Sequence, residues 1–104
     1  MTVLYHPEFA GDIRNFAVRY AAISPRLETR FCREVDTAIA AVLSNPTGAG
    51  HFIPTDSVVL REVRRRNLEI FPFFVLYGLA DDRLVFGSLI PSASDPLTWL
   101  NRFS

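Results

Sequence analysis

The chain has 104 residues, 49% of them apolar and 12% aromatic, which is enough for one hydrophobic core and excludes an intrinsically disordered chain. All eleven basic residues are arginine, and they balance eleven acidic residues. This zero net charge argues against a protein that binds nucleic acid over a broad basic surface. We therefore expect one domain over residues 1–104.

Membrane, disulfide and metal signals are weak. No apolar stretch comes near the roughly 20 residues that cross a bilayer, and the N-terminus lacks the pattern of a secretory signal, so we expect a cytoplasmic protein. The single Cys32 has no partner for a disulfide or a CxxC site, and it is expected at the edge of the core. His6 and His51 are far apart without further ligands at suitable spacing, so the sequence predicts neither a metal nor a cofactor.

The N-terminal residues predict a strand followed by a helix. Thr2–His6 contains strong strand formers and stops before a proline that suits the first turn of a helix. Apolar residues then recur at helical spacing over Pro7–Ala22. Glu8 and Asp12 stand one turn apart at the start of this helix, where solvated carboxylates are favourable.

A second helix follows after a short connection. Ser24 is expected to accept a hydrogen bond from the first turn, with Pro25 at the first helical position. Helical periodicity continues until Asn45 and Pro46 end it, and residues 45–57 then have the composition of a loop. The short connection predicts an antiparallel helical hairpin.

Beyond this loop the period changes from helical to extended. The stretches VVLREVR, IFPFFVLYGLA and DRLVFGSLI are β-branched and aromatic and are joined by short turns, so we expect three successive antiparallel strands. Asp95 is expected to cap a helical turn that begins at Pro96. The order βααβββ predicts an α+β fold: a helical hairpin on one face of a four-stranded, mainly antiparallel sheet, with a short C-terminal helical turn.

Arg61, Arg64, Arg65 and Arg66 stand just before the most apolar run of the chain. Because side chains alternate along a strand, at most two of them can converge on one face. Two interpretations remain open. The arginines form either a solvated strand rim, or a contact surface for an acidic target or partner.

Two aromatic residues could likewise have either a structural or a functional role. Tyr77 lies inside an apolar run, where packing with its hydroxyl on a backbone group is favoured over catalysis. Trp99 is expected to cover the core, although an exposed Trp would also suit an interface anchor. No serine has a GxSxG setting, so nothing indicates nucleophilic catalysis.

Four segments follow one another along most of the chain: YHPEFAGDIRNFAVRYA, RFCREVDTAIAAVLSNPTGAG, LREVRRRNLEIFPFFVLYGLADDRLVFGSLI and SDPLTWL. Together they resemble the RelE/ParE superfamily of toxins from bacterial type II toxin–antitoxin systems. The resemblance implies a ParE-like toxin of a plasmid-stabilisation module, neutralised by a cognate antitoxin. It also implies a homodimer of the free chain or a heterotetramer with the antitoxin.

The chain departs from this family where members usually carry polar groups. Gly78, Pro91 and Ser94 stand where Arg, His and Arg are common, and Phe74 stands where RelE-like nucleases place an Arg. There is no Lys, and no Tyr follows residue 77, so the set that cleaves RNA without a metal is not assembled. The resemblance thus implies an inhibitor that acts by binding, with DNA gyrase as its target.

Two alternatives stay open. In the first, the chain is a ribosome-dependent mRNA endonuclease, with Arg64 and Arg66 as phosphate clamps. In the second, the lost polar positions leave a non-toxic relic that still binds the antitoxin.

Overall fold

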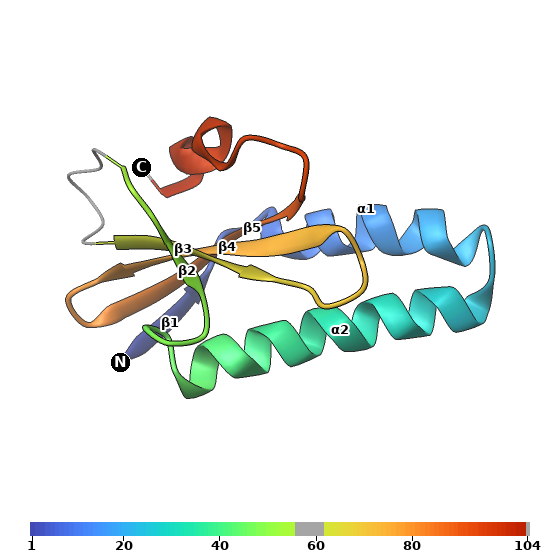
Figure 1. Cartoon of the computed structure of the whole chain (residues 1–104), viewed down its shortest axis with the longest axis horizontal. Coiled ribbons are helices and arrows are strands. Elements are labelled where there is room, and N and C mark those ends of the chain that lie inside the picture. The colour runs from blue at the N-terminus through green and yellow to red at the C-terminus, as the bar shows by residue number, and fades with distance from the viewer. Residues whose placement is uncertain (56–61, 104) are drawn as a thin grey trace.

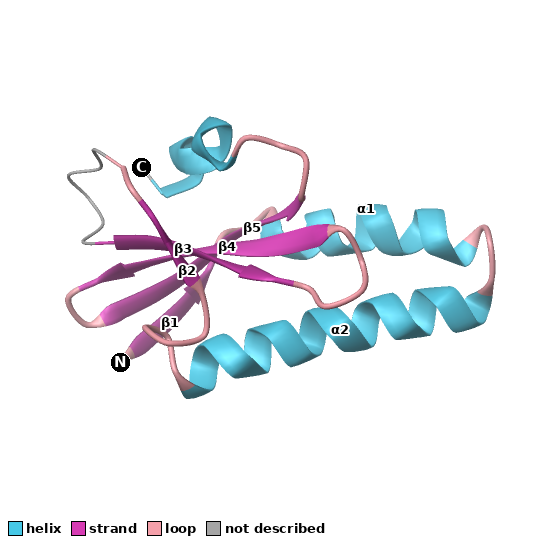
Figure 2. Ribbon diagram, in the orientation of Figure 1, coloured by secondary structure: helices cyan, strands magenta, loops and turns pink. Residues whose placement is uncertain are grey.

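A computed structural model describes residues 1–55 and 62–103 of the chain. In these residues one mixed sheet lies between a helical hairpin on one face and a short C-terminal helix on the other (Figure 1). Figure 2 shows the same layers by type of element. In chain order the elements are β1 (Thr2–Tyr5), α1 (Phe9–Ala21), α2 (Pro25–Ser44), β2 (His51–Ile53), β3 (Glu62–Asn67), β4 (Phe73–Ala80), β5 (Arg83–Pro91) and a 3₁₀-helix, η1 (Pro96–Phe103).

The helix starts follow from local chemistry. Ser24 caps α2 as predicted, because its Oγ accepts a hydrogen bond from the Leu27 N–H at 3.1 Å. α1 begins at Phe9 rather than at Pro7. The backbone first closes a turn there, in which the Phe9 N–H donates to the His6 carbonyl at 2.9 Å. None of the helices in the described ranges is long and apolar enough to cross a membrane.

The sheet of the described residues has five strands in the order β1-β5-β4-β3-β2, one more than predicted. β1 runs parallel to β5, and every other neighbouring pair is antiparallel. The additional strand is β2, within residues 45–57, which were expected to form a loop. Its 3 residues are too few to show alternation in the sequence. It forms because β3 offers a free edge, where Phe52 pairs with Arg64.

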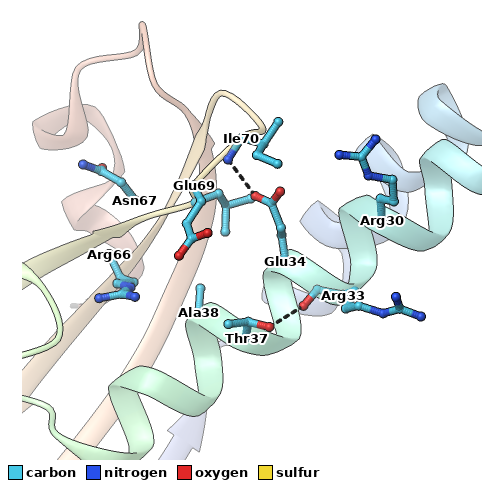
Figure 3. Close-up of a pocket in the computed structure, with 10 residues that line it drawn as sticks. Arg30, Arg33, Glu34, Thr37, Ala38, Arg66, Asn67, Glu69 and Ile70 are labelled. Carbon is cyan, nitrogen blue, oxygen red and sulfur yellow. Dashed lines mark hydrogen bonds between the residues drawn. The ribbon is translucent and has the colours of Figure 1, made fainter.

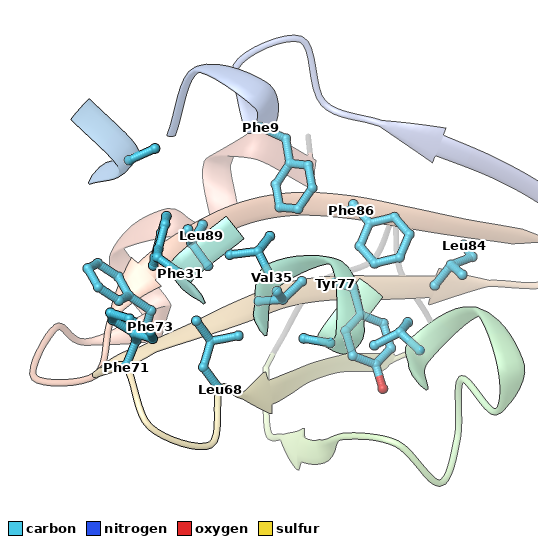
Figure 4. Packing of buried hydrophobic residues seen from close by; sticks show 14 of the residues in the cluster. Phe9, Phe31, Val35, Leu68, Phe71, Phe73, Tyr77, Leu84, Phe86 and Leu89 are labelled. Atoms are coloured by element: carbon cyan, nitrogen blue, oxygen red, sulfur yellow. The ribbon is translucent and has the colours of Figure 1, made fainter. Parts of the chain in front are cut away.

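The main core fills the space between the sheet and the helical hairpin (Figure 4). Phe31 of α2 lies at its centre, with ring centroids 5.5 Å from Phe71 and 5.4 Å from Phe73. Each fully buried Phe contributes roughly 1.5–3 kcal/mol relative to an exposed one. Cys32 is half-buried and packs against this cluster, as predicted.

A second, smaller core covers the opposite face of the sheet. Phe103 of η1 joins sheet residues that include Phe74, Leu76 and Ile90. Gly87 of β5 makes this packing possible, because a Cβ atom there would lie 2.6 Å from the Phe103 ring. The centre of the sheet is therefore buried on both faces, which explains why all of β4 is buried.

Candidate functional site

The arginines of β3 separate onto the two faces of the sheet, as the alternation predicted. Arg64 pairs across the sheet with Tyr77 and Arg66 with Val75, two residues of the helix-side core. Arg65 pairs with Leu76, a residue of the opposite core. Arg61 lies outside the described residues.

Arg64 and Arg66 hold the loop that leads into β2. The Arg64 Nη1 donates to the Gly50 carbonyl at 2.7 Å, and the Arg66 Nη1 donates to the Ala49 carbonyl at 2.9 Å. Arg64 also pairs with Glu62 at 2.6 Å, with both side chains about one-fifth exposed (19% and 21%). These two residues are half-buried and hydrogen-bonded to the backbone, so the solvated-rim interpretation is wrong for them.

Arg65 has different surroundings on the η1 side of the sheet. Its guanidinium carbon lies 3.8 Å from the centroid of the Phe74 ring, and its Nε donates to Asn67 Oδ1 at 3.1 Å. A cation above an aromatic face is stabilised electrostatically and remains available to a second, anionic partner. Of the described arginines on β3, Arg65 is thus the one whose side chain does not hydrogen-bond to the backbone of the loop before β2.

Tyr77 completes the support of this loop. Its ring is fully buried, and its hydroxyl donates to the Pro46 carbonyl at 2.6 Å, which confirms the predicted bond to a backbone group. Burial raises the pKa of the Tyr77 hydroxyl, and the nearby Arg64 opposes this rise. Gly50 passes so close that a Cβ atom there would lie 2.6 Å from the Tyr77 hydroxyl. Tyr77 is therefore a structural residue.

Trp99 is a lid on the second core, as predicted. It is half-buried, packs against that cluster and has the Arg102 guanidinium carbon 5.0 Å from its ring centroid. Phe74 and Gly78 are both buried in β4, and Phe74 packs in the same core as Phe103 of η1. Pro91 and Ser94 form a turn, in which the Ser94 N–H donates to the Pro91 carbonyl at 2.9 Å. The residues at the positions that depart from the family pattern therefore either pack in the sheet or form a turn.

An ion pair that the sequence did not predict covers the end of β5 beyond Phe86, where β1 no longer pairs with it. Arg102 contacts Asp12 through two hydrogen bonds of 2.6 and 3.2 Å, and each side chain is only 12% exposed. Asp12 also accepts from the Leu89 N–H at 3.1 Å, and Arg102 donates to the Gly87 carbonyl at 3.1 Å. The prediction of a solvated Asp12 is therefore wrong. No sequence signal could reveal a pair separated by 90 positions.

A cleft of about 240 Å³ lies between α2 and the β3–β4 turn (Figure 3). Glu34 of α2 anchors the turn by accepting from the Ile70 N–H at 3.0 Å. Guanidinium and carboxylate groups both line the cleft: Arg30, Arg33, Arg66, Glu34 and Glu69. Since its charges are mixed, the cleft does not select an anion or a cation.

The histidines do not form a ligand set. His6 Nδ1 accepts a hydrogen bond from the Glu8 N–H at 3.1 Å, and His51 pairs with Arg65 in the β2–β3 ladder. In residues 1–55 and 62–103, no group of three or more His, Cys, Asp and Glu side chains could hold a metal ion.

Comparison with solved structures finds this fold in a chain of the chromosomal ParDE toxin–antitoxin (TA) system from P. aeruginosa. The TM-score is 0.70 at 17% sequence identity, covering 88% of this chain and 95% of that one. Neither the protein-family models nor the curated proteins give a match. The fold implied by the sequence resemblance is confirmed, and this chain shares the fold of a protein from a ParDE system.

Proposed function

We propose that the chain is the toxin of a type II toxin–antitoxin module. It acts in the cytoplasm by binding its target, DNA gyrase, and a cognate antitoxin neutralises it. The observation that carries this proposal is the structural likeness to a chain of the ParDE system over 88% of the molecule. The sequence resemblance to ParE-like toxins supports the same function.

The surroundings of the polar groups favour binding over RNA cleavage. Cleavage without a metal needs a base near the 2′-hydroxyl and free cations near the phosphate. Tyr77, Arg64 and Arg66 instead bond to carbonyls of residues 46–50. A residue committed to a backbone partner can leave it only at the cost of loop stability.

The residues that the sequence analysis named as candidate contacts differ in how many of their polar groups are already bonded within the chain. Arg61, Arg64, Arg65, Arg66 and Trp99 remain our candidates for the antitoxin or target surface. Of the candidates that the structure describes, Arg65 and Trp99 are the two that share the η1 side of the sheet and do not bond to the loop before β2. Arg64 and Arg66 would contact a partner only through groups left over from their backbone bonds.

Inducible expression of the chain alone tests the proposal, with plasmid supercoiling and mRNA integrity followed in the same culture. We expect growth arrest, altered supercoiling and intact mRNA, and we expect co-expression of the protein encoded beside the chain to restore growth. A Val35→Asp variant is the control for expression burden, because Val35 is 1% exposed in the core and the variant cannot fold normally.

Other outcomes of this experiment would support one of the two alternative functions or contradict the proposal. Arrest with mRNA cut on ribosomes would replace the proposal with the endonuclease. Normal growth with soluble, folded protein would identify a non-toxic relic. Arrest that persists with Val35→Asp would mean that the arrest does not depend on the fold, which contradicts the proposal.

A further inference from the structure

The cleft of about 240 Å³ between α2 and the β3–β4 turn receives charged side chains from both of its sides (Figure 3). Arg30 and Arg33 come from α2, and Arg66 comes from β3 on the other side. Glu34 of α2 and Glu69 of the turn add two carboxylates. Although the mixture selects neither a simple anion nor a simple cation, it suits a ligand that carries both signs of charge.

The two carboxylates of the cleft differ in the bonds that they already make. Glu34 Oε1 accepts from the Ile70 N–H at 3.0 Å and from the Phe71 N–H at 3.4 Å, so its charge holds the turn. Glu69 is exposed, and it forms no hydrogen bond or ion pair with the residues that the structure describes. A cationic group of a ligand would therefore pair with Glu69.

The arginines of the cleft offer donors to an anionic group. The Arg66 Nη1 donates to the Ala49 carbonyl at 2.9 Å, but the Arg66 Nε is buried without a hydrogen-bond partner in the described part of the chain. An unpaired buried donor destabilises the protein, and a ligand oxygen that accepts from it removes this penalty. Arg30 and Arg33 are exposed and form no ion pair within residues 1–55 and 62–103.

We propose that this cleft binds an acidic α-amino acid such as glutamate. The α-carboxylate accepts from the Arg66 Nε, and the α-ammonium pairs with Glu69. The side-chain carboxylate reaches across the cleft to Arg30 and Arg33. Because three guanidinium groups face two carboxylates, the lining has an excess of one positive charge, which an amino acid with a net charge of −1 complements.

The size of the cleft agrees with a ligand of this class. Sites for drug-sized molecules occupy about 300–1,000 Å³, so a cleft of about 240 Å³ suits a smaller molecule. The inference does not depend on the proposed function, because neither the target nor the antitoxin takes part in it.

An NMR titration of the whole, ¹⁵N-labelled chain with L-glutamate tests the proposal. The Arg66 Nε–H and the Ile70 backbone N–H report on the two sides of the cleft. Both resonances are expected to shift and to saturate, with a dissociation constant in the millimolar range. Glutarate lacks the ammonium group and γ-aminobutyrate lacks one carboxylate, so each should bind at least fivefold more weakly than L-glutamate.

Two variants assign the charged groups. Glu69→Gln should weaken L-glutamate at least fivefold but should not weaken glutarate, which has no ammonium group to lose a partner. The double variant Arg30→Gln/Arg33→Gln should weaken both ligands at least fivefold. All three side chains are exposed, so the variants are expected to fold, and their ¹⁵N–¹H spectra show whether they do.

Matched variants lie outside the cleft on exposed helical positions. Asp36→Asn is the control for Glu69→Gln, and Arg14→Gln/Arg26→Gln is the control for the double variant. Each should change the affinity for L-glutamate less than twofold. Equal losses in the controls would indicate an effect of overall charge, and glutarate bound as tightly as L-glutamate would indicate a plain anion site. Either result, or the absence of a saturable shift, would overturn the proposal.

Discussion

The Tyr77 hydroxyl places a polar group in the core and bonds to the Pro46 carbonyl at 2.6 Å. Tyr77→Phe removes the donor and leaves this carbonyl without its partner. We expect a loss of about 1–2 kcal/mol in the free energy of unfolding at neutral pH, measured by urea denaturation. Tyr5→Phe is the control, because Tyr5 is 53% exposed on β1 and should lose less than about 0.5 kcal/mol.

Wild type and Tyr77→Phe should also differ in how their free energy of unfolding depends on pH. Burial raises the pKa of Tyr77 in the folded state, while the unfolded value is about 10. The stabilising contribution is therefore complete below about pH 10 and is lost as the pH rises through the folded-state pKa. Between pH 9 and 12, wild type should lose stability more steeply than Tyr77→Phe. Parallel pH curves would contradict a buried, neutral hydroxyl.

At the scale of residues, the sequence could predict alternation but not partners. It placed Arg65 opposite to Arg64 and Arg66, and it placed the Tyr77 hydroxyl on a backbone group. It could not predict which carbonyls accept, because these belong to a loop whose path depends on β2. It also could not predict the burial of Asp12, since the cause is an arginine at the other end of the chain.

At the scale of elements, one ion pair connects η1 with α1 and with the part of β5 that extends beyond its pairing with β1. Arg102→Met keeps a long apolar side chain but removes both bonds to Asp12 and the bond to the Gly87 carbonyl. Breaking a buried pair leaves an uncompensated carboxylate, so we expect about 3 kcal/mol of destabilisation. Chemical denaturation followed by fluorescence measures this, and Trp99, the single Trp, reports on η1 directly.

The control for this variant is Arg14→Met. Arg14 is also close to Asp12 in the sequence, but its side chain is exposed on α1. It should change stability by less than about 0.5 kcal/mol. If Arg102→Met were as mild as Arg14→Met, and the Trp99 emission kept its wild-type maximum, the pair would not hold η1 on the sheet.

The elements that could be predicted from the sequence are those with a hydrophobic periodicity over many residues or with a recognisable helix cap. The helical hairpin has both, with Ser24 as its clearest signal, and β4 and β5 contain long apolar runs. The strand predicted over residues 58–64 overlaps only the first three residues of β3, because β3 is Glu62–Asn67 and residues 58–61 lie outside the described part of the chain. β2 was missed because 3 residues between Gly and Pro carry no period. Its existence depends on a neighbouring edge rather than on its own composition.

At the scale of the whole molecule, the sheet has two protected faces and two short edges. β4 lies at its centre, with every residue buried and a hydrogen-bonded strand on each side. β1 and β2 form the edges, and all four residues of β1 are exposed. Short edge strands limit pairing with other chains, which suits a protein with zero net charge and therefore little mutual repulsion.

This arrangement predicts a graded pattern of amide hydrogen exchange. Amides of β4 should exchange only through global unfolding, because no local opening exposes a strand covered on both faces and both sides. Amides of β1 and β2 should exchange orders of magnitude faster by fraying, each strand having a single neighbour. Residue-resolved exchange measured by NMR tests this. Protection of β2 equal to that of β4 would mean that Arg64, Arg66 and Tyr77 join the loop and its edge strand to the central cooperative unit.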